Sequence, residues 1–228
     1  MSFLRFPDET LHFVRELRAN NNREWFHAHS KDYENFYVAP AKEFVEEAGR
    51  QIRSFIPDIR AEPKILGSIF RINRDSRYAK QGKPYKDHLD FWFWEGERKE
   101  AVSGLFVRIA PEFVGIGAGC HGFDKERLEI FREAVANPRL GELLVEEVTA
   151  IENAGYVVQG YAYKRLPSVQ GPEARFLHFK ALYVHTDEPA QIATQNGKLM
   201  AACVRHWRAL GGLHRWLTSF VQFRKKNM

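Results

Sequence analysis

The residues best suited to chemistry are cations that recur through the segment from residue 69 to residue 94. Asp75, Asp87 and Asp90 are the acidic residues interspersed among them. Arginine offers a planar fork that grips phosphate or carboxylate through two hydrogen bonds, and lysine supplies a mobile point charge. The spacing therefore predicts an anion-binding site, and its cations stand at every third position: Arg71, Arg74, Arg77, Lys80, Lys83 and Lys86.

Two residues of the same segment are candidate catalytic groups. His88 shares a strand face with Asp90 in the predicted strand, and this pairing suits a general acid or base. Asp75 could pair with a neighbouring arginine and orient it. The alternative is an exposed strand histidine, with loop charges that only keep an edge strand soluble.

A second stretch, early in the chain, contributes one more cation. Asn21 followed by Glu24 resembles a capping box at the start of a short helix that carries Trp25 and Phe26 inward. Arg23 would add a full charge beside the free N–H groups of that helix start, where anions are favoured. The alternative reading of this stretch is helix capping alone.

Three motifs follow one another in order: Asn21-Asn-Arg-Glu-Trp-Phe26, the run from Ile69 to Lys80, and Lys83-Pro-Tyr-Lys86. Their order and spacing resemble an uncharacterised family of bacteria and fungi known as domain of unknown function 2461. Tyr78 stands where phenylalanine is commoner in that family, and Gln81-Gly82 stand where an acidic residue is expected. Lys164-Arg-Leu-Pro167 is followed by Ser-Val-Gln in place of the usual Gly-Phe. The resemblance implies a shared α+β domain with the same motif centre, and it brings no established activity.

Helical periodicity marks both ends of the chain. Apolar residues spaced for one helix face predict helices near the N-terminus, just after the middle of the chain and at the C-terminus. The last helix is expected to break at Gly211-Gly212. The predicted helices cover residues 7–19, a short stretch after residue 21, a third from Ser30, and 41–55, 124–137, 140–153 and 199–220.

Short segments rich in β-branched and aromatic residues predict a mostly antiparallel sheet between the helices. The fold class is therefore α+β, with N-terminal helices, a central sheet and further helices packed on it, in a single domain covering residues 1–228. Residues 110–112 are expected to form a hairpin turn. The predicted strands are 65–72, 89–94, 102–109, 113–118, 156–165 and 181–184.

Strand geometry assigns faces to the motif residues. Up to Asp75, alternation would place Arg71 on the side of Ile69 and Asn73, with Arg74 opposite. In the following strand, one face should line the site and the other should enter the core. The first of these faces carries His88, Asp90, Trp92 and Trp94, and the second carries Leu89, Phe91 and Phe93.

Composition limits the remaining classes of protein. The chain has 228 residues, a net charge of +5 and two cysteines, which favour a globular cytoplasmic protein with reduced thiols. No apolar run is long enough to span a membrane, so no membrane partner is expected. No metal-ligand motif is present, and Gly117–Gly122 matches a dinucleotide-binding pattern without the parallel strands it needs. Any cofactor stays unknown.

Two classes of function remain, with a third as the plainest alternative. The preferred one is a site for an anionic small molecule, possibly enzymatic. The second is a nucleic-acid-binding module in which the same cations contact phosphates and aromatic side chains stack on bases. The third is a structural or interaction domain stabilised by Arg–Asp pairs. The aromatic candidates for stacking are Tyr78, Tyr85, Trp92 and Trp94.

Overall fold

A computed structural model describes residues 3–75, 83–160 and 171–226 of the chain. Arg77, Tyr78, Lys80, Lys164 and Arg165 lie outside these described residues. Internal contacts divide the chain into two compact units. The first unit comprises Met1–Phe93, Phe106–Ile116 and Asp187–Arg205, and the second comprises Trp94–Leu105, Gly117–Thr186 and His206–Met228. The single domain expected from chain length stays a prediction.

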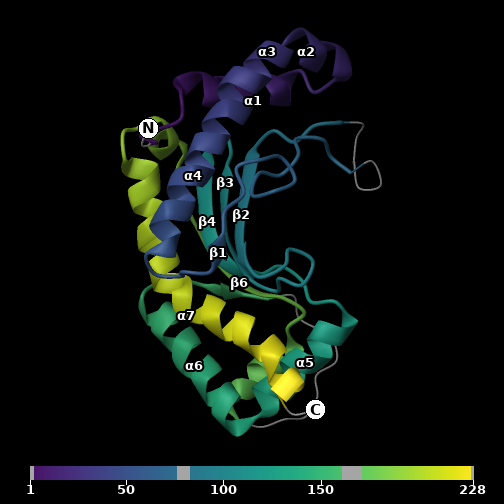
Figure 1. Cartoon of the computed structure of the whole chain (residues 1–228), viewed down its shortest axis with the longest axis vertical. Coiled ribbons are helices and arrows are strands. Elements are labelled where there is room, and N and C mark those ends of the chain that lie inside the picture. The colour runs from purple at the N-terminus through teal and green to yellow at the C-terminus, as the bar shows by residue number, and fades with distance from the viewer. Residues whose placement is uncertain (1–2, 76–82, 161–170, 227–228) are drawn as a thin grey trace. The chain divides into compact units, whose positions relative to one another are not determined.

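The secondary structure confirms the predicted α+β class (Figure 1). The N-terminal helices are α1 (Asp8–Ala19), α2 (Arg23–Ala28), α3 (Ser30–Asp32), a π-helical turn (Tyr33–Val38) and α4 (Ala39–Arg53). The later helices are α5 (Lys125–Ala136), α6 (Pro138–Asn153) and α7 (Lys198–Lys226), with 3-10 segments at Pro172–His178 and Ala190–Thr194. Among the described residues, no helix is long and apolar enough to cross a membrane.

The sheet has six strands in the order β1-β2-β3-β4-β6-β5. Ala110 donates its N–H to the carbonyl oxygen of Phe113 at 2.9 Å, which closes the predicted hairpin turn. Gly155, at φ 87°, follows α6 in the left-handed conformation that ends many helices. The strands are β1 (Ile59–Arg60), β2 (Leu89–Glu95), β3 (Gly104–Ile109), β4 (Phe113–Cys120), β5 (Val158–Gln159) and β6 (Leu182–Pro189).

The core of the first unit forms where α4 packs on one face of β2. Phe44 of α4 contacts Phe91 of β2 with ring centroids 4.7 Å apart, and Phe6 lies against both. Alternation along β2 buries Leu89, Phe91 and Phe93, as the sequence predicts. Asp90 and Trp92 are only half-buried on the other face. The predicted alternation of β2 is therefore confirmed for these residues, but Trp94, predicted on the face of Asp90 and Trp92, is fully buried.

The core of the second unit is aromatic and joins its helices. Phe131 of α5 contacts Trp216 and Phe220 of α7 at centroid distances of 5.9 and 5.8 Å. Trp216 also donates its indole N–H to the carbonyl oxygen of Leu140 in α6, at 2.8 Å. These contacts bury the apolar stripes that the periodicity of the sequence predicts for the three helices.

The prediction of a strand over residues 65–72 is wrong. Leu66 has φ 66° and, with Gly67, turns the chain, so the segment forms only isolated bridges, Ile65 with Ile69 and Ile69 with Phe91. Ile69 is fully buried while Arg71 is exposed, so the two do not share a side as strand alternation would require. A turn at the start of the segment thus replaces the regular pleat.

The predicted break of the last helix at Gly211-Gly212 is also wrong. α7 runs without interruption from Lys198 to Lys226. A Cβ atom at position 212 would overlap the carboxylate of Glu147 from α6. That carboxylate is the far end of a flexible side chain and can move, and the helix continues through both glycines because its hydrogen bonds do not depend on a Cβ atom.

Gly119 provides a test of strand packing in the second unit. Its φ is 127°, and a Cβ atom there would collide with the backbone of Leu182 and Tyr183 on the neighbouring strand. Gly119→Ala is expected to lower the free energy of unfolding by more than about 2 kcal/mol, measured by urea denaturation. Gly122→Ala is the matched control, because nothing lies within 4 Å of its Cβ position, and it should change stability by less than about 0.5 kcal/mol. Equal effects of the two substitutions would contradict the packing at Gly119.

Candidate functional site

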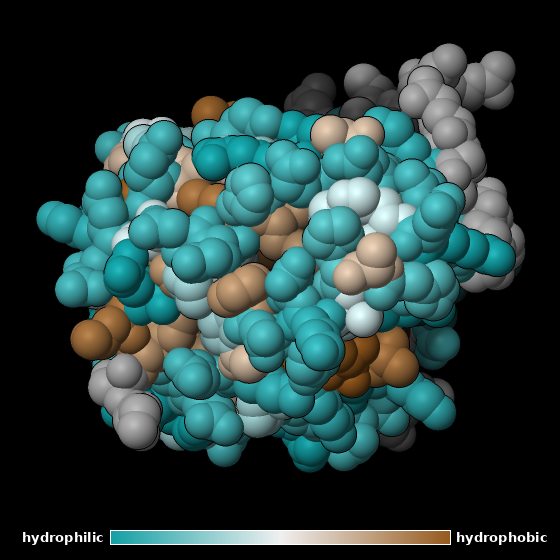
Figure 2. All heavy atoms as spheres, turned by 90° about the horizontal axis from the view of Figure 1, so that it is seen from above, coloured by the Kyte–Doolittle hydropathy of each residue, from teal (hydrophilic) through white to brown (hydrophobic). Residues whose placement is uncertain are grey.

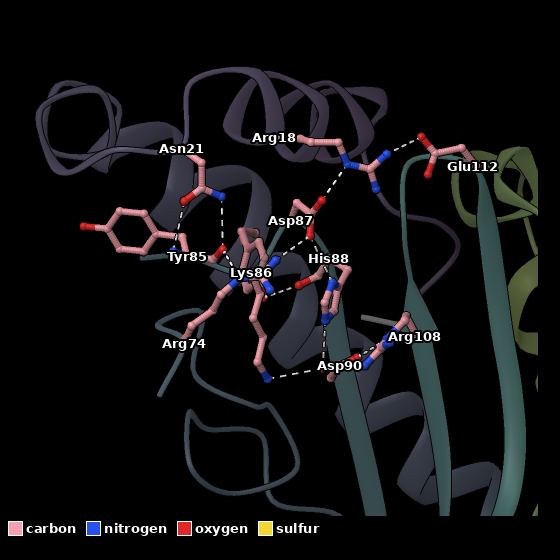
Figure 3. Close-up of polar contacts among 11 residues, drawn as sticks. Arg18, Asn21, Arg74, Tyr85, Lys86, Asp87, His88, Asp90, Arg108 and Glu112 are labelled. Carbon is pink, nitrogen blue, oxygen red and sulfur yellow. Dashed lines mark hydrogen bonds and ion pairs between the residues drawn. The ribbon is translucent and has the colours of Figure 1, made fainter. Parts of the chain in front are cut away.

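The candidate site is built on the segment from Tyr85 to Asp90, which leads into β2, and it lies within the first unit (Figure 3). The segment contains two carboxylates, Asp87 and Asp90, and both are surrounded by cations. The side chains that reach it come from α1, from the turn between α1 and α2, from the chain around residue 74 and from β3. The site therefore joins parts of the chain that are far apart in sequence.

The turn between α1 and α2 fixes the start of this segment. Asn21 accepts a hydrogen bond from the N–H of Tyr85 and donates one to its carbonyl oxygen, both at 3.0 Å. The ring of Phe26 stacks on that of Tyr85 with centroids 4.1 Å apart. Asn21 thus acts toward Tyr85 as a neighbouring strand would, since it satisfies both backbone groups of one residue.

The predicted capping role of Asn21 is wrong by one position. Asn22 is the residue that caps α2, and its side chain accepts the N–H of Trp25 at 2.9 Å. Both asparagines are suited to capping by type, and only the contact with Tyr85 distinguishes them. Trp25 and Phe26 are half-buried, and Trp25 contacts the core residue Phe13 while it stacks on His29.

Asp87 is held by two arginines from different parts of the chain. Arg18 of α1 donates to one carboxylate oxygen at 2.5 Å, and Arg74 donates to the other at 3.1 Å. Burial raises the pKa of Asp87, but the hydrogen bond from Arg18 and the charges around it hold the pKa below its ordinary value. Arg18 also pairs with Glu112, and Arg74 Nε donates to the carbonyl oxygen of Tyr85 at 2.6 Å. Arg74 is therefore engaged in fixing the fold of the segment.

Asp90 is the second point at which cations converge. Arg108 of β3 donates to both of its carboxylate oxygens, at 2.7 and 3.2 Å, and Lys86 Nζ lies 3.2 Å from Oδ2. Burial raises the pKa of Asp90, but hydrogen bonds from His88 and Arg108 outweigh that effect and hold the pKa well below its ordinary range. Asp90 is therefore ionised at neutral pH although its side chain is only 14% exposed.

His88 lies between the two carboxylates. Its Nδ1 is 3.4 Å from Asp87 Oδ1, and its Nε2 is 3.2 Å from Asp90 Oδ2. The backbone carbonyl of His88 accepts the hydroxyl of buried Tyr37 at 3.1 Å, which fixes the residue from the core side. Both ring nitrogens can donate to carboxylates only when the imidazole is doubly protonated. The ring therefore faces a carboxylate at each of its two nitrogens.

The other predicted site residues differ in how closely they join this network. Arg71, Lys83 and Arg23 have exposed side chains and form no ion pair with another described residue. Asp75 is half-buried at the edge of the described segment. Arg77 and Lys80 lie outside the described residues. The structure thus brings together Arg74, Lys86 and His88 from the predicted set.

Sequence reasoning missed three residues of the network: Arg18, Arg108 and Glu112. The sequence does indicate the direction of Arg108. It is a lone cation between Val107 and Ile109, which are both buried, in a predicted strand, so its side chain has to point away from the core. No sequence pattern points to Arg18, since a basic residue in the last turn of a helix is common for electrostatic reasons alone. Its role depends on the packing of α1 beside Asp87.

Metal and thiol chemistry receive no support from the geometry. Within the described residues, no group of three or more histidine, cysteine or acidic side chains is arranged to hold a metal ion. Cys120 and Cys203 are buried and unpaired with each other, and burial raises the pKa of Cys120 to about 11. The Gly117–Gly122 pattern overlaps β4 of an antiparallel sheet, so it lacks the parallel βαβ setting of a dinucleotide site.

Asn21→Ala tests the clamp on Tyr85. The substitution leaves the N–H of Tyr85, a residue only 5% exposed, without its partner. We expect a loss of about 2 kcal/mol in the free energy of unfolding, measured by chemical denaturation. Asn20→Ala is the control, since the half-buried side chain of Asn20, which follows α1, donates only to the carbonyl oxygen of Glu16 among the described residues. A loss that is no larger than the control's would show that the clamp contributes nothing.

The depressed pKa of Asp90 predicts how stability depends on pH. An aspartate in the unfolded chain has a pKa of about 3.9, so the unfolded chain takes up a proton before folded Asp90 does as the pH falls. The stabilisation from Asp90 is thus complete at neutral pH and is lost progressively below about pH 4. Asp90→Asn should show a shallower loss of unfolding free energy in acid, with Asp8→Asn as the control for net charge. Parallel acid profiles for wild type and Asp90→Asn would contradict the ion pairs.

Comparison with known proteins places the chain in a family. A search of curated proteins finds no match to the sequence. Residues 9–216 match the family described as conserved hypothetical protein (DUF2461). The matched range includes the Asn21 clamp, the segment from Tyr85 to Asp90 and Arg108, and it confirms the resemblance seen in the sequence motifs. The chain therefore belongs to the DUF2461 family.

Proposed function

We propose that the protein binds a small anionic molecule that carries phosphate or carboxylate groups, at the cations around Asp90. The observation that carries this proposal is an excess of positive charge at one carboxylate. Lys86 and Arg108 both contact Asp90, so two full positive charges are balanced by a single negative one, with His88 beside them. An anion placed there would be attracted by the net charge that remains.

The geometry of the donors supports the same conclusion. Lys86 has three N–H donors and directs one of them to Asp90, and its position is further fixed by the ring of Phe70, 4.9 Å from Nζ. Arg108 uses Nε and Nη2 on Asp90 and is 48% exposed, so its second Nη group is available to a ligand. Because Asp90 orders both cations in advance, a ligand would lose little free energy in organising them.

The remaining cations differ in role under this proposal. Arg74, which the sequence suggested as a binding residue, is engaged by Asp87 and the carbonyl oxygen of Tyr85. Arg71 lies beside the site, because the N–H of Phe70 bonds to the carbonyl oxygen of Asp90 at 3.0 Å and the carbonyl oxygen of Ile72 accepts from Lys86 at 2.8 Å. Exposed Arg71 is thus a further cation beside the site that a ligand with a second anionic group could contact.

His88 is the proposed proton-transferring group, should the bound molecule be transformed. The side chain of His88 is 16% exposed. Its ring contacts Asp90, the carboxylate that Lys86 and Arg108 also contact. A proton released from the imidazole would come from a position next to the bound anion. Asp75 stays a second candidate for an orienting role on the strength of its place in the motif.

Burial of the aromatic residues favours the small-molecule proposal over a nucleic-acid module. Base stacking requires exposed ring faces. Tyr85 is 5% exposed and covered by Phe26, and Trp94 is fully buried. Trp92 is half-buried, and Tyr78 lies outside the described residues. The face shown in Figure 2 is mainly hydrophilic, with apolar residues scattered in separate groups.

Titration with inorganic phosphate and pyrophosphate tests the proposal. In chloride buffer, either anion should raise the melting temperature and give a saturable heat of binding in calorimetry. The double substitution Lys86→Gln and Arg108→Gln should weaken binding by at least about tenfold, because charge-assisted hydrogen bonds to the anion are lost. Lys42→Gln is the control, as it removes an exposed cation from α4.

The outcomes separate the three classes of function. Binding that is unaffected by the double substitution would overturn the assignment of Lys86 and Arg108. A steep fall in affinity for a single-stranded oligonucleotide between low and moderate salt, without binding of pyrophosphate, would support the nucleic-acid module. If Arg74→Met lowers stability and neither anion binds to the wild type, the motif has a structural role.

A further inference from the structure

A separate polar array lies in the second unit and is made of Ser103, His214 and Glu95. Ser103 Oγ is 2.9 Å from His214 Nδ1, and His214 Nε2 is 3.0 Å from Glu95 Oε2. Ser103 is 3% exposed and His214 is fully buried, while the side chain of Glu95 is 22% exposed. The three residues come from the end of β2, from the chain just before β3 and from the middle of α7. None of them belongs to the cation cluster of the first unit.

The hydrogen bonds of His214 determine where the proton of a neutral ring resides. An ionised carboxylate only accepts hydrogen bonds, so Nε2 must carry the proton that faces Glu95. Nδ1 then presents its lone pair to Ser103, whose hydroxyl donates to it. This arrangement is that of a serine nucleophile with its general base and orienting acid, with the two ring nitrogens exchanged relative to the common form.

Glu95 is held ionised in the position that this arrangement requires. The hydrogen bond from His214 is the main cause that holds the pKa of Glu95 below its ordinary value, against the effect of partial burial. Thr218, one turn after His214 in α7, donates its hydroxyl to the carbonyl oxygen of His214 at 2.9 Å. α7 thus carries the ring, and the ring in turn holds its acidic partner through Nε2.

We infer that Ser103 is a nucleophile toward small acyl esters, with His214 as its general base and Glu95 as the residue that orients His214. Ser103 Oγ would attack the ester carbonyl carbon while its proton passes to His214 Nδ1. The carbon–oxygen bond to the leaving alcohol would then break, and that alcohol would take the proton from His214. Water, deprotonated by the same nitrogen, would hydrolyse the acyl-serine and regenerate the hydroxyl.

The burial of the array limits the class of ester. A substrate must lose its hydration to reach a hydroxyl that is 3% exposed beside a fully buried imidazole. This loss is costly for a charged or strongly polar molecule and small for an apolar one. The substrate expected here is therefore a small uncharged ester, in contrast to the anion proposed for the first unit.

An alkyl fluorophosphonate tests the inference directly on the full-length protein. The serine oxygen displaces fluoride from phosphorus, so the expected result is a single covalent adduct that peptide mass spectrometry locates at Ser103. Glu95→Gln should slow the labelling by about 10²-fold, because the amide no longer enforces the required tautomer, and Ser103→Ala should abolish it. Glu95→Gln is the better variant to make first, since Glu95 is partly exposed and glutamine keeps the shape of the side chain.

The chain contains its own control serine. Ser68 is also buried, but its Oγ accepts the backbone N–H of Glu62 and has no histidine in that contact. It should remain unlabelled, and the urea-unfolded wild-type chain should not react at either serine. Equal labelling of Ser103 in the folded and unfolded chains, no adduct in the folded protein, or an unchanged rate in Glu95→Gln would each overturn the inference. The comparison of folded with unfolded wild type holds even if a variant fails to fold.

Discussion

The first unit depends on how two partly buried carboxylates, Asp87 and Asp90, are neutralised. A charge removed from water is costly unless opposite charges and hydrogen bonds replace the water that it loses. Here the compensation comes from separate parts of the chain, so the two carboxylates keep α1, the chain around residue 74 and β3 in a fixed arrangement. The side chains that compensate them are Arg18, Arg74, Lys86, His88 and Arg108.

This constraint divides the cations around the two carboxylates into two groups. Arg74 and Arg18 are engaged at Asp87, and Arg74 also bonds to the backbone of Tyr85, so their charges are used in holding the segment. Lys86 and Arg108 share one carboxylate and keep further N–H donors, which the proposed anion would use. Two cations of the regularly spaced motif, Arg74 and Lys86, therefore differ in their contacts in a way that composition does not reveal.

His88 and His214 differ in the groups that face their ring nitrogens. His88 faces a carboxylate with each ring nitrogen, so its ring is arranged to donate on both sides. His214 faces a carboxylate on one side and a hydroxyl on the other, which leaves a lone pair directed at Ser103. The first arrangement suits a proton donor beside an anion, and the second suits a base that activates a nucleophile. The same side chain is thus placed in different hydrogen-bonding arrangements by its neighbours.

The sequence by itself determined the α+β class, the positions of most helices and strands, and the family. These features follow from local periodicity, which needs no knowledge of distant contacts: the alternation in β2 and the stripes of α4, α5 and α6 are examples. It also predicted the segment on which the candidate site is built, including Lys86 and His88. Tertiary structure alone decided that Asn21 clamps Tyr85 while Asn22 caps α2, that Leu66 turns a segment resembling a strand, and that Arg108 joins Lys86 at Asp90. The reason is physical, because hydrogen bonds and ion pairs form between residues brought together by folding, and their partners lie too far along the chain for any local pattern to specify them.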